Sequence, residues 1–283
     1  MKLVRFGPSG REKPGILDAE GRIRDLSKVV ADLAGDVLSP RGLAKIKKAA
    51  AGRLPIIKGK PRLGPCVGRV GHFIGIGLNY ADHAAESGVP LPKEPVIFEK
   101  APSSMCGPND DTIMPKNATK LDYEVELGLV IGRRGRYLEK SNAMDVVAGY
   151  CIGNDVSERA FQHEREGQWT KGKSAETFGP LGPWLVTKDE IKDPQNLAMW
   201  LTVNGESRQK GSTKTMVFDC PHLVWYCSQF MVLEPGDVIV TGTPPGVAMG
   251  MKPTPKYLQA GDVVRLGIDG LGEQQQKVVA FKP

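Results

Sequence analysis

The stretch LDYEVELGLVIG, residues 121 to 132, places two glutamates inside an otherwise apolar run. Side chains alternate along a β-strand, so Glu124 and Glu126 share one face and the neighbouring apolar residues take the other. Two like charges side by side are unfavourable unless a cation lies between them. An exposed strand face with glutamates paired to lysine is the alternative, but the strongly apolar flanks favour a central strand. The fold must therefore bring a cation to this strand.

Short strands of this kind recur along the chain, and helical patterns are few. The 34 glycines and 22 prolines, with only 6% aromatic residues, favour many short strands and tight turns over long helices. The helical patterns are SNAMDVVAGY, SERAFQHERE and CPHLVWYCSQF, and the further strand patterns include HFIGIGL, VIFEK, VAGYCIGND, WLTVNG, DVIVTG and DVVRLGI. We therefore expect a mainly β fold with some α-helix.

The first part of the chain predicts a small N-terminal α+β domain over residues 1–68, followed by a larger domain over 69–283. MKLVRF and PGILDAEGRIRDL fit strands, the second folded into a hairpin at residues 18–21. A helix is expected after Ser39 as N-cap, with Pro40 in its first turn and Gly52 past its end. Residues 53–70 are rich in Pro, Gly and Lys, as is typical of a connector.

Charge and cysteine usage narrow the class of protein. The formal net charge is +6, but the densest basic stretch, residues 44–62, contains no aromatic residue, so we expect no nucleic-acid partner. Positive charge can still attract a small anionic substrate. The five cysteines form no CxxC motif, and no secretory or membrane-spanning run is present, so we expect reduced thiols, a cytoplasmic location and no membrane partner.

GIGLNY, residues 75 to 80, resembles part of a dinucleotide-binding loop. It lacks the third glycine and an acidic residue at the expected distance after a clear βαβ unit. We therefore expect Gly75 and Gly77 to let the chain turn and flex after a strand, and not to bind a dinucleotide.

The next residues, NYADHAAESG, contain a candidate general base. His83 and Glu86 lie three apart, so they share a face of a helical turn. Glu86 can accept a proton from one imidazole nitrogen, which leaves the other free to activate water. The alternative is a surface helix with an incidental His–Glu pair. Glycine on both sides, with Pro90 after the turn, is the composition of a lid.

Asp155 in VAGYCIGNDVSERA is the candidate third acid beside Glu124 and Glu126. It lies where a strand ends and a helix begins, so the alternative is an ordinary helix N-cap. Three carboxylates without a neighbouring His or Cys suit Mg²⁺, Mn²⁺ or Ca²⁺ and are poor ligands for zinc. Three acids exceed the charge of a divalent ion, so extra cations are expected from Arg159 and Lys173.

Several segments together resemble the fumarylacetoacetate hydrolase family: GLNYADHAAE, FEKAPSS, LDYEVELGLVIG, NDVSERAFQ, QWTKGKSAETFGPLGPW and PGDVIVTGTPPGV. They occur in the right order across residues 70 to 250. The resemblance implies the family's mixed β-sandwich roll, a homodimer and Mg²⁺ or Mn²⁺ as cofactor. The first 60 residues are similar to the small N-terminal domain of longer bacterial members.

The resemblance also assigns roles to individual residues. It implies metal ligands at Glu124, Glu126 and Asp155, a catalytic dyad of His83 and Glu86, a catalytic and substrate-binding lysine at Lys173, and substrate contacts from Arg159, Gln162 and Thr243.

Within the family, GLNYADHAAESG, GPNDD, QWTKGKS, DPQNLAMWL and KPTPKYLQAGDVV look closest to 2,4-diketo-3-deoxy-L-rhamnonate/L-fuconate hydrolases. That implies cleavage of a small anionic keto acid, a 2,4-diketo acid, to pyruvate plus lactate. The alternatives are a ureidoglycolate lyase, an oxaloacetate decarboxylase, or a hydroxyheptadienedioate isomerase-hydratase. A metal-stabilised scaffold without activity is a further alternative, and the intact pair of His83 and Glu86 speaks against it.

Overall fold

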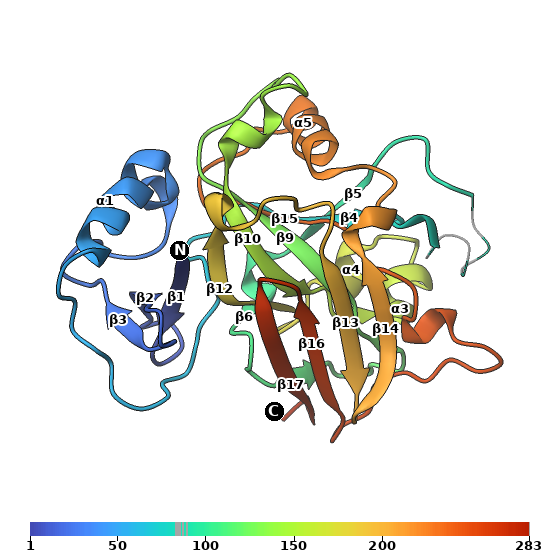
Figure 1. Ribbon diagram of the computed structural model, residues 1–283. Helices are drawn as coiled ribbons and strands as arrows, with labels where there is room; N and C mark the ends of the chain where they lie inside the picture. Colours follow the sequence, from blue (N-terminus) through green and yellow to red (C-terminus); the bar gives the residue numbers. More distant parts are fainter. Residues whose placement is uncertain (83–85, 87, 89, 283) are drawn as a thin grey trace.

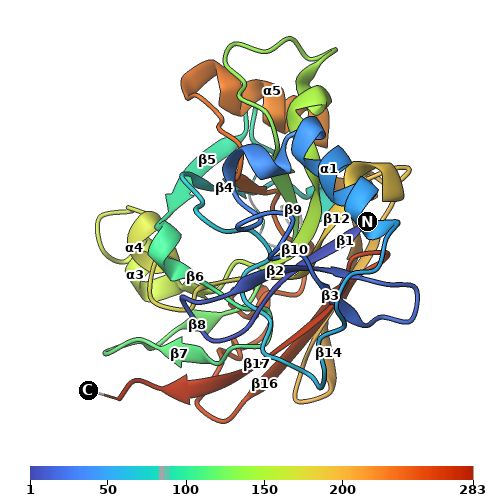
Figure 2. The same ribbon diagram turned by 90° about the vertical axis from the view of Figure 1, so that its left-hand side faces the viewer.

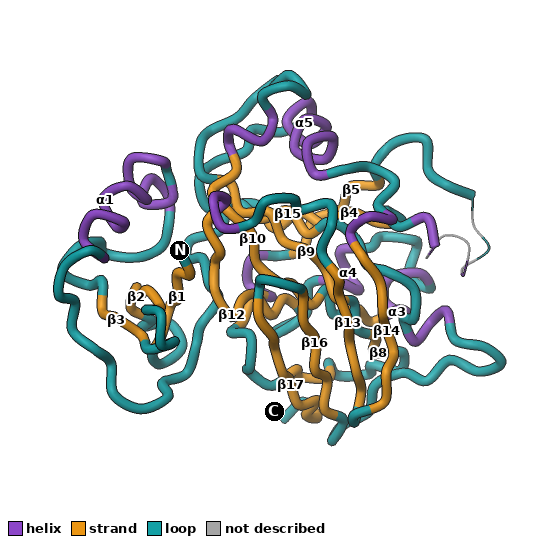
Figure 3. The backbone as a smooth tube through the Cα atoms, viewed as in Figure 1, coloured by secondary structure: helices purple, strands orange, loops and turns teal. Residues whose placement is uncertain are grey.

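The structure is a computed structural model that describes residues 1–82, 86, 88 and 90–282. Two large sheets and a few short helices make up the fold, which confirms the predicted mainly β class with α-helix (Figure 1, Figure 3). No helix in the described part of the chain is long and apolar enough to cross a membrane.

The larger sheet carries the glutamate-bearing strand at its middle. β9 (Val125–Ile131) lies between β10 (Val147–Asn154) and β15 (Val238–Val240), and every residue of β9 is buried. The prediction of a central strand is therefore confirmed. The remaining strands of this sheet are β3 (Ile23–Asp25), β2 (Lys13–Leu17), β1 (Lys2–Phe6) and β12 (Gly179–Thr187) on one side, β4 (Phe73–Gly77) and β5 (Val96–Lys100) on the other, and β6 (Met105–Cys106) beside β12.

The second sheet shares a hydrophobic core with the first. Leu127 and Leu129 of β9 lie in the same buried cluster as Leu201 and Leu266 from the second sheet, all at 0% exposure. Burial of this apolar surface is the main source of stability expected for such a two-sheet fold. The strands of the second sheet, in order, are β14 (Glu206–Ser212), β13 (Ala198–Val203), β16 (Val263–Ile268), β17 (Gly272–Ala280) and β7 (Thr112–Met114), while β8 (Leu121–Asp122) and β11 (Ser157–Glu158) form a separate pair.

The N-terminal segment extends the larger sheet. β1 pairs antiparallel with β12, with Lys2 opposite Val186, so β3, β2 and β1 continue the same sheet (Figure 2). The predicted hairpin at residues 18–21 is confirmed by the antiparallel pairing of β2 and β3. The predicted helix is α1 (Pro40–Ala50), in which Ser39 accepts a hydrogen bond from the Gly42 amide. The boundary at residue 68 stays a prediction.

The other helices are short, and one prediction among them is wrong in part. α5 (Cys220–Phe230) matches the predicted CPHLVWYCSQF, while α3 (Arg159–His163) and α4 (Thr170–Lys173) are brief. SNAMDVVAGY forms only a 3-10 turn before it joins β10, because its later residues pair with β9 and β12. The 3-10 turns are Gly35–Leu38, Pro102–Ser104, Ala143–Val146, Lys188–Glu190, Thr213–Thr215 and Ala248–Gly250.

Candidate functional site

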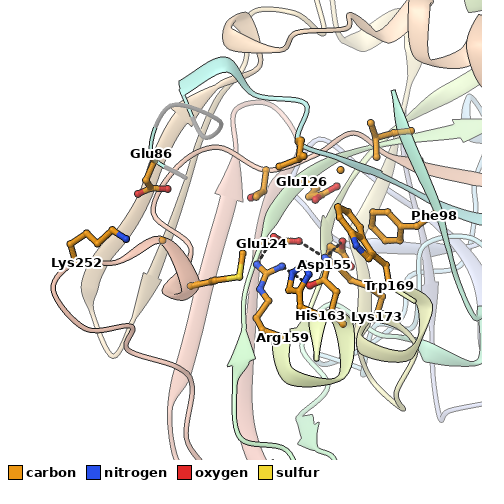
Figure 4. A pocket seen from close by; sticks show the side chains of 17 residues that line it. Glu86, Phe98, Glu124, Glu126, Asp155, Arg159, His163, Trp169, Lys173 and Lys252 are labelled. Carbon is orange, nitrogen blue, oxygen red and sulfur yellow. Dashed lines mark hydrogen bonds and ion pairs between the residues drawn. The ribbon is translucent and has the colours of Figure 1, made fainter. Parts of the chain in front are cut away.

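Three carboxylates meet where β9 and β10 run side by side. Asn154 at the end of β10 pairs with Val125, and the Asp155 amide donates to the Glu124 carbonyl at 2.9 Å. One oxygen from each of Glu124, Glu126 and Asp155 lies within 4.8 Å of the others, and all three residues are buried (Figure 4). The exposed-face alternative for the glutamates is therefore wrong.

The N-cap alternative for Asp155 is also wrong. The side chain that caps α3 belongs to Glu158, which accepts a hydrogen bond from the Ala160 amide. The Asp155 carboxylate instead accepts from two lysines, through Oδ1 from Lys100 and through Oδ2 from Lys173.

The two cations expected beside the acids both contact them. Lys173 Nζ lies 2.6 Å from an oxygen of Glu124 and 2.6 Å from an oxygen of Asp155, and Arg159 Nη2 lies 2.6 Å from the other oxygen of Glu124. Burial acts to raise the pKa of Glu124, but the charges of Arg159 and Lys173 outweigh it and lower that pKa to about 2. Glu124 is therefore ionised at neutral pH.

Glu126 has a different environment. It accepts a hydrogen bond from the Gly242 amide at 2.8 Å, and burial, followed by the charges of Asp155 and Glu124, raises its pKa well above the usual value. An ionised Glu126 therefore calls for additional positive charge nearby. The oxygen-only donor set and this surplus of negative charge fit a divalent ion such as Mg²⁺ or Mn²⁺.

Two charged residues of this site were missed in the sequence. Lys100 is fully buried, with Nζ 2.5 Å from Asp155 Oδ1. Asp122 is also fully buried, and it accepts from Arg159 Nε at 2.9 Å and from the Ala248 amide at 2.8 Å. Their positions gave no signal of a role, since Lys100 ends the strand pattern VIFEK and Asp122 is the second residue of the run that contains the glutamates. A charge at a strand end is most often exposed.

The acids open onto a cavity of about 450 Å³. Gln162 and Thr243 line it, as the resemblance implies for substrate contacts. Gln162 Oε1 accepts from Arg159 Nη1 at 3.0 Å, which leaves the amide group of Gln162 as a donor. Thr243 donates to the Val125 carbonyl at 2.9 Å and accepts from Gln209 at 2.8 Å, so its hydroxyl is held in place.

Aromatic rings form one wall of the cavity, and two glycines make room for them. Phe98 and Trp169 have ring centroids 5.4 Å apart. A Cβ on Gly75 would lie 2.2 Å from the Phe98 ring, and a Cβ on Gly77 would lie 2.4 Å from the Trp169 ring. Both glycines belong to β4, so the expectation that they let the chain turn and flex after a strand is wrong. They are needed for close packing.

The predicted dyad is only half described. Glu86 lines the cavity, is exposed, and accepts a hydrogen bond from the Gly246 amide at 3.1 Å. His83 lies outside the described residues, so its pairing with Glu86 stays a prediction.

Known proteins resemble this chain in sequence and in fold. Residues 72–279 match the family model described as fumarylacetoacetate (FAA) hydrolase, C-terminal. A Burkholderia multivorans protein, provisionally described as a hydrolase, is 63% identical over 276 residues, covering 98% of each chain. Maleylpyruvate hydrolase from Sphingobium sp. SYK-6, solved with manganese(II) ion and pyruvate, is 29% identical, with a TM-score of 0.82 and 100% of both chains covered. The 5-carboxymethyl-2-hydroxymuconate delta-isomerase from Mycobacterium smegmatis is 32% identical, with a TM-score of 0.79 and 100% of both chains covered.

Proposed function

The chain belongs to the fumarylacetoacetate hydrolase family, and from that membership we propose that it hydrolyses a carbon–carbon bond in a 2,4-diketo acid, with Mg²⁺ or Mn²⁺ as cofactor. The substrate we propose first is 2,4-diketo-3-deoxy-L-rhamnonate, which is the same compound as its L-fuconate counterpart because C2 and C4 are ketones in both, and which is cleaved to pyruvate and lactate. The sequences of segments such as GPNDD and QWTKGKS support this choice of substrate, while family membership supports the reaction class.

One observation carries the proposal. Three buried acids gather at the inner end of a cavity large enough for a small organic acid, with Lys173 and Arg159 directly beside them. Buried carboxylates are costly even when cations pair with them, and a cluster of buried acids whose pKa values are shifted, lining a cavity, is typical of a functional site. The maleylpyruvate hydrolase that shares this fold was solved with manganese(II) and pyruvate, which supports a divalent ion and a pyruvate product here.

A divalent ion held by Glu124, Glu126 and Asp155 would supply Lewis acidity to the carboxylate and 2-keto oxygens of such a substrate. Lys173 and Arg159, which pair with the acids, would also act on the substrate. When the C3–C4 bond breaks, its electron pair passes to the pyruvate half, and Lys173 and Arg159 place positive charge where that negative charge develops.

His83, supported by Glu86, is proposed to take a proton from the water that attacks C4. Water then contributes a hydroxyl group to C4 and a proton to C3. The products are pyruvate and the carboxylic acid that carries the rest of the substrate.

Release of pyruvate from a panel of 2,4-diketo acids tests the proposal. The purified protein should release pyruvate with Mn²⁺ or Mg²⁺ present, and chelation with EDTA should abolish the release until metal is restored. Full activity in EDTA would contradict the cofactor assignment. The hydrolase assignment would be contradicted if no 2,4-diketo acid released pyruvate while the protein formed urea from ureidoglycolate, decarboxylated oxaloacetate or isomerised a dienoate.

A further inference from the structure

Lys100 is a buried cation that takes no part in the mechanism proposed above. Its side chain is 0% exposed at the end of β5, and its ammonium lies 5.7 Å from the centre of the Phe73 ring. An ammonium so far from water is expensive unless every proton is matched by an acceptor.

All three donors of this ammonium are used. Nζ lies 2.5 Å from Asp155 Oδ1, 2.6 Å from the Lys173 carbonyl and 3.4 Å from the Val156 carbonyl. An ammonium has three protons to donate and no acceptor, so Lys100 has none left for a ligand. It also does not line the cavity. Any effect on chemistry must therefore act through the groups it holds.

The groups that Lys100 contacts belong to two segments that supply residues of the site: the end of β10 with Asp155 directly after it, and α4 with Lys173. Lys100 holds the Asp155 side chain and the main chain that bears Lys173. Its neighbours reinforce the second contact, since Thr170 Oγ1 donates to the Glu99 carbonyl and the Ala101 amide donates to Ser174 Oγ, both at 2.8 Å. Three consecutive residues thus fasten the end of β5 to α4.

The Asp155 carboxylate is divided between two lysines. Lys100, which does not line the cavity, forms an ion pair with Oδ1. Lys173, which lines the cavity, forms an ion pair with Oδ2. We propose that Lys100 is a positioning residue, whose buried ammonium fixes the Asp155 carboxylate and the Lys173 main chain in the geometry that binds a divalent ion. This inference rests on the metal dependence proposed above.

The sign of the effect separates positioning from simple electrostatics. Removing a positive charge near a cation site should tighten cation binding if repulsion dominates. Removing the group that orients a ligand should weaken binding, typically by 10–100-fold for partners just behind the ligands. We expect the second effect to dominate, because Lys100 holds both Asp155 and the main chain of Lys173.

The test is Mn²⁺ titration, followed by the EPR signal of free Mn²⁺, on wild-type protein and on Lys100→Met and Lys100→Gln. Gln keeps neutral donors for the two carbonyls, so it should remain folded even if Met does not. Both variants should raise the Mn²⁺ dissociation constant at least about 10-fold. Lys188→Met is the control. Lys188 Nζ donates to the Met144 carbonyl at 2.6 Å and contacts none of the three acids, so this variant should leave the Mn²⁺ dissociation constant unchanged.

A purely structural lysine would lower the melting temperature and leave the dissociation constant of the folded protein alone. Unchanged or tighter Mn²⁺ binding in folded Lys100→Gln would therefore overturn the inference. The proposed function fails separately: a wild-type protein that binds Mn²⁺ but releases no pyruvate contradicts that function, while the ratio of dissociation constants still decides the role of Lys100.

Discussion

At the scale of single residues, Glu124 has the clearest electrostatic assignment. Its carboxylate bridges Arg159 and Lys173, and its pKa falls from 4.5 to about 2 despite burial. A carboxylate whose pKa is lower in the folded than in the unfolded protein stabilises the fold at any pH above its unfolded-state pKa. This stabilisation is lost as the pH falls through the folded-state pKa. The ionised form of Glu124 therefore stabilises the metal-free protein at neutral pH.

We predict that Glu124→Gln lowers the free energy of unfolding at pH 7 by about 3 kcal/mol, at about 1.4 kcal/mol per pKa unit. The difference from wild type should shrink as the pH falls from 4.5 towards 2, because wild-type Glu124 is then protonated as well. Urea titrations of metal-free protein at several pH values measure it. Glu234→Gln is the control, since Glu234 forms an exposed pair with Arg134 and should matter little at any pH. A deficit that does not depend on pH would contradict the assignment.

A second prediction at this scale concerns the proposed base. His83→Ala should lower kcat by about 10²–10⁴, the range typical of general base catalysis, and should leave Mn²⁺ affinity intact. His72→Ala is the matched control, because His72 pairs with Glu99 at 41% exposure and does not line the cavity. Wild-type turnover in the His83 variant would remove this residue from the mechanism.

The sequence predicted the ligand-bearing residues better than their supports. Glu124, Glu126 and Asp155 stood out because charge inside apolar runs breaks the usual pattern, and the structure brings them together. Lys100 and Asp122 did not stand out, since each lies at the end of a strand, where a charge is ordinary. Only the tertiary fold shows that these ends are buried.

At the scale of elements, β4 shapes the cavity because two of its residues, Gly75 and Gly77, have no side chain. Its two glycines face Phe98 and Trp169 at distances that exclude even a methyl group. The sequence predicted the strand but not this purpose, because a glycine shows no preference until its neighbours are known.

We predict that Gly77→Ala costs about 1–3 kcal/mol of stability through overpacking and lowers kcat/KM by displacing Trp169. Adding Trp169→Leu should restore stability, since it removes the ring that clashes. Gly52→Ala, where the nearest atom would be 3.4 Å away, serves as control. Chemical denaturation and steady-state kinetics measure both effects, and a neutral Gly77→Ala would contradict the packing argument.

At the scale of the whole molecule, the N-terminal segment is bound tightly to the remainder. Leu3 and Leu26 share a buried cluster with Val130 and Leu181 of the larger sheet. The sequence predicted the hairpin and the helix of this segment from local signals. It could not predict that β1 would pair with β12, because that pairing joins residues nearly two hundred positions apart.

Removal of residues 1–68 should therefore expose one edge of β12 and half of a shared core. We expect the truncated chain to aggregate or to lose its cooperative unfolding transition, measured by size-exclusion chromatography and circular dichroism. A soluble truncated chain with an unchanged melting temperature would show that residues 69–283 fold without the N-terminal segment, and would contradict the shared-core argument. The same chromatography with light scattering on the full chain tests the predicted homodimer.

The charges around Asp155 also bear on how ligands influence one another. The buried cluster of ion pairs around the acids contains the carboxylates of Asp122, Glu124, Glu126 and Asp155 and the cationic side chains of Lys100, Arg159 and Lys173. A bound divalent ion would favour the ionised form of Glu126, and with all seven groups ionised the cluster and the ion together would carry one positive charge. A monoanionic acid would then restore neutrality. Cation and anion should thus bind with positive cooperativity, and thermodynamic reciprocity requires pyruvate to tighten Mn²⁺ binding by the same factor by which Mn²⁺ tightens that of pyruvate.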